Sequence, residues 1–164
     1  MSREPGREQL FQQLIEETRG SQRATDLVDE AACQLMGINR TDGRCLDILE
    51  QRGRMTAGEL AAEARLTTGA ITAVIDRLER AGYAHRVPDS ADRRRVLVEP
   101  TPKAFEVSEE LMGPLGEAGW PKASSYSDQE LELIVDFVRF SRELQENHAE
   151  WLRARLAERQ AKAP

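Results

Sequence analysis

Apolar side chains recur every three or four positions along most of this chain, which is the spacing of one face of an α-helix. Residues 8–19 carry such a stripe, and we expect Gly20 and Ser21 to interrupt it. A second stripe then runs to Gly37, and a third helix is expected to start at Thr41 or Asp42 and to end near residue 53. The first third of the chain is therefore predicted to be helical.

The sequence TAGEL at 56–60 predicts the start of a short helix. The Thr56 hydroxyl can accept a hydrogen bond from the amide of Glu59 while the Glu59 carboxylate reaches back, which is a capping box. After a brief break, Thr67 or Thr68 can cap a second helix, whose apolar positions follow the helical spacing. Two such consecutive helices predict a helix-turn-helix.

The hydrophobic period changes to two after this helix. YAHRV at 83–87 and RRVLVE at 94–99 are short and β-branched, and the PDSAD between them is typical of a turn. We expect a β-hairpin with adjacent arginines at its tip and on its returning strand.

Two further helical patterns follow the hairpin. One opens at Pro102, which suits a first helical turn, and the glycines and prolines at 113–121 are expected to break or kink it. The other, residues 126–156, is the longest helical pattern in the chain. A helix of that length cannot bury its apolar stripe on a small lobe alone, so we expect it to pack against another helix, in this chain or in a partner.

The chain is acidic overall, with a net charge of −6 over 164 residues, but the charge is unevenly distributed. The segment 52–95 holds nine arginines and six acids, so it is +3 and the remainder is −9. A basic middle segment permits nucleic acid as a partner. The chain shows no apolar run of about 18 residues and no secretory signal, so we expect a cytoplasmic protein without a membrane span.

The order of a capped helix, a turn, a second helix and a basic hairpin predicts a winged helix-turn-helix that binds double-stranded DNA. The second helix fits the major groove, and small or hydroxyl side chains at its start suit base contacts. An arginine at a hairpin tip can enter the minor groove, with Asp89 and Asp92 accepting hydrogen bonds that orient the arginines. The predicted DNA-contacting residues are Thr67, Thr68, Gly69, Ala70, Thr72, Ala73, Arg77, Arg80, Arg93, Arg94 and Arg95. Asp76 lies near this face and is expected to pair with Arg80 or with an arginine of the hairpin.

The run from TAGELA through IDRLERAGY to DRRR resembles the MarR family of transcriptional regulators, closely over about residues 35–105. The resemblance implies a mainly α fold with a small β-hairpin wing, in one domain over 1–164. The DNA-binding lobe would span 38–100, and residues 1–37 and 101–164 would form dimerisation helices. By position in the motif, Thr67 to Ala73 fall on the base-reading helix start, Arg77 on a phosphate contact, and Asp92, Arg93 and Arg94 on the wing.

The resemblance also implies a function. Members of the family bind pseudo-palindromic operators as homodimers, usually as repressors, and often release DNA when a small phenolic or other lipophilic compound binds. For such an effector we expect a pocket near Cys33, Met36 and Cys45.

Three positions depart from the family pattern. The family often has glycine in the turn where this chain has Arg65, which requires either a negative φ or modest strain. Gly69 and Ala70 stand where hydroxyl or amide side chains are common, so we expect little direct hydrogen-bond readout of bases and more reliance on shape.

Cys33 and Cys45 are not in a CxxC pair, which favours two small buried thiols in reduced surroundings. A redox-sensing thiol is the alternative, and it would need an exposed position with a low pKa.

No residue cluster has the spacing of a metal site, a phosphate loop or a catalytic nucleophile, so neither an enzyme nor a metal or other cofactor is expected. The alternative function is a helical protein-interaction regulator that has kept the fold but lost sequence-specific DNA binding.

Overall fold

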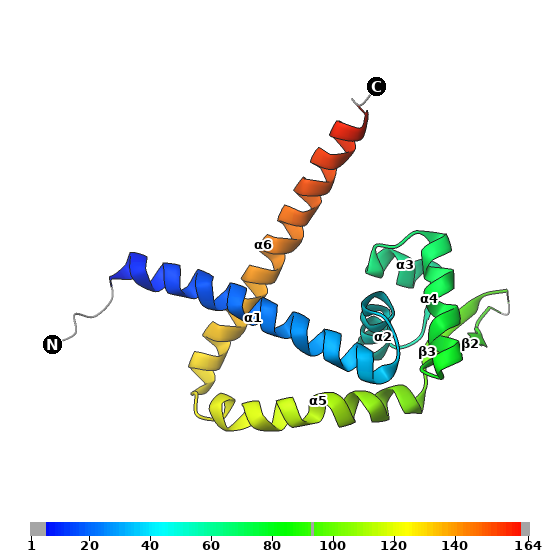
Figure 1. The fold of residues 1–164 in the computed structure, drawn as a ribbon, viewed down its shortest axis with the longest axis horizontal. Coiled ribbons are helices and arrows are strands. Elements are labelled where there is room, and N and C mark those ends of the chain that lie inside the picture. Colours follow the sequence, from blue (N-terminus) through cyan, green and yellow to red (C-terminus); the bar gives the residue numbers. More distant parts are fainter. Residues whose placement is uncertain (1–5, 93, 162–164) are drawn as a thin grey trace. The chain divides into compact units, whose positions relative to one another are not determined.

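The structure, a computed structural model, describes residues 6–92 and 94–161. The predicted mainly α fold with a small hairpin is confirmed (Figure 1). The chain divides into two compact units, residues 1–113 and 114–164, which are described separately. In chain order the elements are α1 (Arg7–Met36), α2 (Arg40–Arg52), β1 (Met55–Thr56), α3 (Ala57–Ala64), α4 (Thr68–Ala81), β2 (Ala84–Pro88), β3 (Val96–Pro100), α5 (Pro102–Ala123) and α6 (Asp128–Ala161).

Capping side chains set the start of each helix in the first unit's helix-turn-helix. The predicted capping box is confirmed, because the Thr56 side chain accepts from the Glu59 amide while the Glu59 carboxylate accepts from the Thr56 amide. The Thr67 hydroxyl caps α4 by accepting from the Ala70 amide at 3.3 Å. These local hydrogen bonds satisfy amides that the helix itself leaves unpaired.

The turn between α3 and α4 contains a non-glycine residue in the left-handed region. The sequence left two possibilities for Arg65, a negative φ or modest backbone strain. Arg65 has φ 54° and ψ 46°, so the turn is strained. A side chain in this region costs about 1 kcal/mol relative to glycine. The turn therefore has a backbone conformation that a glycine would adopt with less strain.

Two expected breaks do not occur: α1 runs through Gly20 and Ser21, and α5 runs through residues 113–121, where a kink stays a prediction. A single glycine lowers helix stability by only about 1 kcal/mol, which the rest of a long helix offsets. Pro114 and Pro121 each remove one backbone hydrogen bond, but this part of α5 is exposed and water can reach the freed carbonyl groups. Helix length thus overrides local breakers at both places.

The core of the first unit lies between α2, α3, α4 and a three-stranded antiparallel sheet of order β1-β3-β2. The sequence pattern did not predict β1, which has two residues, too few to show a period. The predicted inner face of α4 is confirmed, since its four apolar side chains are buried. The largest fully buried apolar side chains are Leu49, Leu60, Ile71, Val74, Ile75, Leu78 and Val98.

Both cysteines are buried, as predicted. Burial raises the pKa of the Cys33 thiol and of the Cys45 thiol, so neither has the thiolate character that a redox sensor needs. Cys33 lies where α1 meets α2, and a Cβ placed on Gly43 would come within 2.5 Å of its Sγ atom. The absence of a side chain at Gly43 therefore allows α1 and α2 to approach.

The second unit has almost no core of its own. No described residue of α6 is buried, although the helix has 34 residues. Within the described ranges, no helix has both the length and the apolar character required to cross a membrane. The exposed large apolar side chains of α6 are Leu133, Ile134, Val135, Val138, Phe140, Leu144, Trp151, Leu152 and Leu156.

We expect Gly43→Ala to lower the free energy of unfolding by about 1–3 kcal/mol, because the new methyl group overpacks against Cys33. Gly69→Ala is the matched control, since no atom lies within 4 Å of its Cβ position, and it should raise stability by about 0.5–1 kcal/mol. Urea unfolding of both variants measures the difference. Combining Gly43→Ala with Cys33→Ala should recover most of the loss, and equal stability of the two single variants would contradict the packing argument.

Candidate nucleic-acid interface

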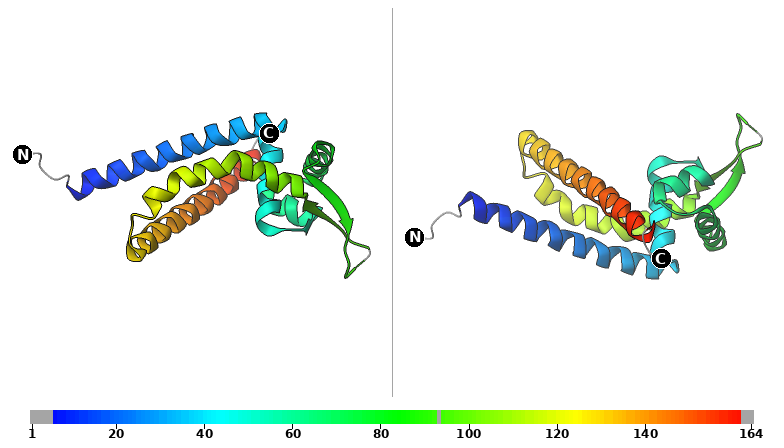
Figure 2. Two further views of the ribbon diagram at one scale, coloured as in Figure 1. Left: turned by 90° about the horizontal axis from the view of Figure 1, so that it is seen from below. Right: turned by 90° about the horizontal axis from the view of Figure 1, so that it is seen from above.

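The predicted base-reading start of α4 lies on the surface of the first unit. Its six residues, from Thr67 to Ala70 and then Thr72 and Ala73, are all exposed. The side chains are small, which allows the helix backbone to approach a groove closely. The hairpin of β2 and β3 reaches beyond helices α2, α3 and α4 in both views of Figure 2.

The hydroxyl groups on this face are partly committed to the helix. The Thr67 oxygen accepts from the Ala70 amide, and the Thr72 hydroxyl donates to the Thr68 carbonyl at 3.0 Å. These bonds leave few side-chain donors for base edges, because Gly69 and Ala70 add none. The geometry therefore supports a surface that reads shape and makes close backbone contacts.

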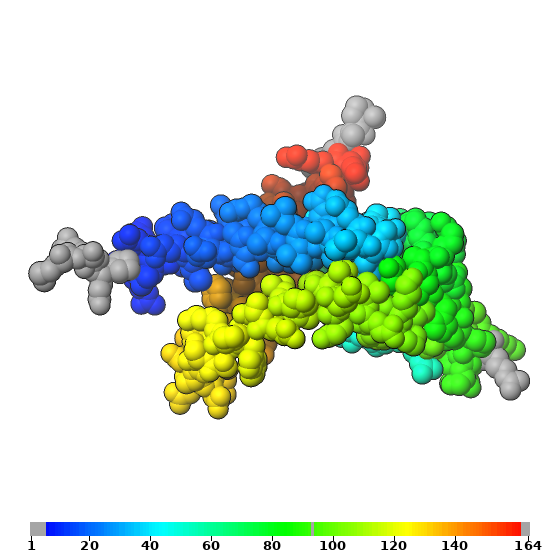
Figure 3. Space-filling view, turned by 60° about the horizontal axis from the view of Figure 1, so that its bottom comes forward, coloured from blue at the N-terminus to red at the C-terminus, as the bar shows by residue number. Residues whose placement is uncertain are grey.

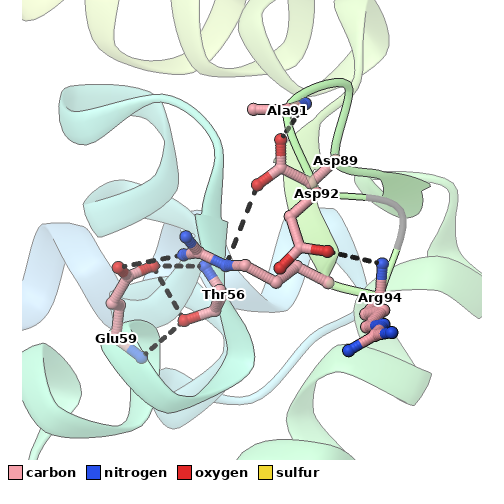
Figure 4. Close-up of polar contacts among 7 residues, drawn as sticks. Thr56, Glu59, Asp89, Ala91, Asp92 and Arg94 are labelled. Atoms are coloured by element: carbon pink, nitrogen blue, oxygen red, sulfur yellow. Dashed lines mark hydrogen bonds and ion pairs between the residues drawn. The ribbon is translucent and has the colours of Figure 1, made fainter.

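The two wing aspartates organise the hairpin tip through backbone amides. Asp89 accepts from the Ala91 amide at 2.9 Å, and Asp92 accepts from the Arg94 amide at 3.0 Å (Figure 4). Both are Asx-type turns, in which a short carboxylate stabilises the chain reversal. In Figure 4 the Arg94 side chain lies apart from Glu59 and Asp89, at the outer side of the tip. Arg93 lies outside the described residues.

Arg95 lies between two carboxylates rather than standing free. Its guanidinium is 3.6 Å from Glu59 of α3 and 3.8 Å from Asp89 of the hairpin. Hydrogen bonds from Thr56 hold the pKa of Glu59 below its ordinary value, so this carboxylate stays charged opposite Arg95. The returning strand is thereby tied to the start of α3.

A second arginine ties the hairpin to α4. Arg86 of β2 contacts Asp76 at 2.8 Å and also pairs with Glu79, whose carboxylate accepts from the Arg86 amide at 2.9 Å. Asp76 therefore pairs with an arginine of the hairpin, and no pair with Arg80 occurs among the described residues. The charge of Asp76, which lies close to the predicted DNA-facing side of α4, is thus neutralised by Arg86 within the protein.

Arg77 forms an ion pair with Asp42, a residue to which the sequence pattern gave no role. Its Nε and Nη2 atoms donate to the carboxylate of Asp42, at 2.8 Å and 2.6 Å in the shortest contacts. Asp42 is 1% exposed and Asn39 also donates to it, at 2.8 Å. Because the partners are 35 positions apart, no local signal in the sequence could have shown this pair.

Two of the predicted DNA-contacting arginines remain available. Arg80 on the last turn of α4 and Arg94 at the hairpin tip are exposed, and their side chains have no hydrogen-bond or ion-pair partner in the part of the chain that the structure describes. The arginines of the expected site thus separate into ion-paired ones, Arg77 and Arg95, and ones whose side chains have no partner among the described residues, Arg80 and Arg94.

A cavity of about 540 Å³ lies in the first unit, where α1, α2 and α5 line its sides. Figure 3 shows α1 and the first half of α5 on one face of this unit. Of the three residues expected near an effector, Met36 lines this cavity and Cys33 and Cys45 do not. Both cysteines are buried, and an effector site near these three residues stays a prediction. Further lining residues include Ala32, Leu46, Glu50, Leu111 and Met112.

Comparisons with known proteins agree with this geometry. Residues 38–96 match the sequence profile of the MarR family. An uncharacterised HTH-type transcriptional regulator of Bacillus subtilis (strain 168), YcgE, is 38% identical over 153 residues, which cover 93% of this chain and 99% of YcgE.

Solved structures of the same fold include a MarR family protein from Bacillus stearothermophilus, with a TM-score of 0.61 and 24% identity over 88% of this chain and 99% of that one. The S. aureus MepR–DNA complex matches with a TM-score of 0.52 and 18% identity, over 66% of this chain and 92% of that one. The family consists of transcriptional regulators rather than enzymes. The chain therefore belongs to the MarR family of winged helix-turn-helix, DNA-binding transcriptional regulators.

Proposed function

We propose that this protein is a ligand-responsive repressor that binds a pseudo-palindromic operator as a homodimer, in the cytoplasm where that DNA lies. The observation that carries the proposal is the exposed start of α4 beside a hairpin whose tip presents Arg94. A helix start of small residues fits the major groove, and a tip arginine fits the electronegative minor groove. MepR, a protein of the same fold, has been solved in complex with DNA, which supports this arrangement.

The proposed DNA-contacting residues are divided by role. Thr67, Thr68, Gly69, Ala70, Thr72 and Ala73 enter the major groove, where close backbone approach and thymine-methyl contacts contribute most. Arg80 meets a phosphate as the helix leaves the groove, and Arg94 enters the minor groove with Arg93 beside it.

A second copy of the chain is the proposed partner of α6. Successive residues of an α-helix lie about 100° apart around its axis. Val138, Leu144, Trp151 and the other apolar side chains therefore lie on one broad side of α6, and Arg139 lies on the opposite, charged side. An apolar side of this length that is exposed in one chain is typical of a permanent interface. Two lobes joined in this way would present their recognition helices about 34–36 Å apart, to successive major grooves.

The cavity between α1, α2 and α5 is the proposed effector site. Its volume is within the range of sites for small organic ligands, and Met36, Leu46, Leu111 and Met112 line it together with charged residues such as Arg44 and Glu50. A lipophilic or phenolic ligand would bind one arrangement of the three helices better than another, and so shift the population away from the DNA-binding state.

Arg94→Ala should weaken binding to a duplex that carries the DNA upstream of this chain's own gene, by about 1–3 kcal/mol and with little dependence on sequence. The plot of log affinity against log salt should also become less steep. Fluorescence anisotropy at several KCl concentrations measures both quantities. Arg139→Ala, on the charged side of α6, is the control and should bind as the unmodified protein does. A folded dimer that shows no salt-sensitive DNA binding would favour the protein-interaction alternative.

Val138→Glu combined with Leu144→Glu should convert the dimer to a monomer, because each charge would be buried in an apolar interface. Sedimentation velocity measures the change. Arg139→Glu, which alters charge on the opposite side of α6, should leave the dimer intact. A monomeric unmodified protein would refute the interface on α6.

Glu50→Gln should raise the midpoint of thermal unfolding at pH 7 and lose this advantage near pH 4. Burial raises the pKa of Glu50 above its ordinary value, although the hydrogen bond from Ser108 acts in the opposite direction. A raised folded-state pKa means that the protonated form stabilises the fold, fully at low pH and no longer once the pH exceeds that pKa. Glutamine mimics the protonated form at every pH. Glu132→Gln, on exposed α6, should change the midpoint at neither pH.

A further inference from the structure

The contact between Asp42 and Arg77 joins the first turn of α2 to the middle of the recognition helix α4. Arg77 Nε lies 2.8 and 3.1 Å from the two carboxylate oxygens, and Nη2 lies 2.6 Å from one of them. Asn39, which caps α2, donates to the same carboxylate and accepts from the Asp42 amide at 3.0 Å. Both carboxylate oxygens are therefore held by directed hydrogen bonds.

This contact supplies a restraint that the apolar core does not. The hydrophobic attraction among the buried side chains of α4 has no preferred direction. A guanidinium that meets a carboxylate through two nitrogens has a fixed planar geometry. The pair therefore adds a directed restraint on the rotation of α4, and with it on the direction in which the base-reading residues point.

The pair lies close to the surface that faces DNA. A shallow hollow is lined by Asn39, the cap of α2, by Thr41 of α2, and by Ala70, Ala73 and Arg77 of α4, and the two alanines belong to the base-reading set. A free carboxylate here would repel phosphate, and a free arginine would attract it. Because the two neutralise each other, the pair as a unit offers no net charge to the DNA backbone.

We propose that Asp42 and Arg77 are positioning residues for DNA binding, and that Arg77 acts by holding α4 in register rather than by neutralising a phosphate. The proposal rests on the DNA-binding face described above. Arg80, three residues further along the same helix and without a partner among the described residues, is the arginine of α4 that contacts the backbone.

The test is a set of variants assayed by fluorescence anisotropy on the upstream duplex at several KCl concentrations. Arg77→Ala and Asp42→Ala should each lower affinity by about tenfold, and the double variant should be no weaker than the weaker single one. The slope of log affinity against log salt should not change in the double variant, because it removes both charges of the pair. Arg80→Ala, the matched control, should make the slope less steep by about 0.9, the value for one lost phosphate contact.

Arg77→Lys distinguishes a positioning role of Arg77 from a phosphate contact. Lysine can satisfy a phosphate as a point charge, but it cannot reproduce the two-nitrogen contact with Asp42. We expect Arg77→Lys to remain nearly as weak as Arg77→Ala. Circular dichroism checks that each variant is folded, and Asp42→Asn, which keeps the shape of the side chain, replaces Asp42→Ala if the latter is not.

Restored binding by Arg77→Lys would overturn the proposal, and so would an Asp42 variant that binds as tightly as the unmodified protein or more tightly. If the unmodified protein shows no salt-dependent binding, the proposed function fails instead, which distinguishes the two failures.

Discussion

The orientation of the recognition helix depends on one buried carboxylate. Asp42 is almost completely removed from water, and its charge is tolerated because Arg77 and Asn39 donate hydrogen bonds to both of its oxygens. A buried charge that loses its partner is strongly destabilising, so arrangements of α2 and α4 that separate the two are excluded. The apolar core beneath sets the distance between the helices, and the ion pair sets their rotation.

The acidic residues within the basic segment have a related role. Asp76 and Glu79 hold Arg86, and Glu59 and Asp89 hold Arg95, so the hairpin is joined to α4 on one side and to α3 on the other. Each exposed pair contributes little to stability alone. Because these acids are paired with Arg86 and Arg95, they leave Arg80 and Arg94 exposed in a chain with a net charge of −6.

The two units differ in how complete they are as folded structures. The first contains a closed core whose buried apolar side chains come from four helices, the sheet and the turn before β2, and it needs no other chain to exclude water from them. In the second, α6 buries none of its described residues, so its apolar side is stabilised only when something else covers it. The proposed dimer would therefore be a requirement of folding as well as of operator geometry.

Local physics in the sequence determined the boundaries of the helix-turn-helix and the hairpin. The capping box at Thr56, the cap at Thr67, the apolar spacing of α4 and the turn residues after Pro88 all act within a few positions, so one sequence suffices to predict them. The tertiary structure alone decided that α1 continues through Gly20, and that Arg77 and Arg95 face carboxylates while Arg80 and Arg94 face none within residues 6–92 and 94–161. A hydrogen bond between neighbours depends on local spacing, whereas the partner of a long side chain depends on which distant element packing brings within its reach.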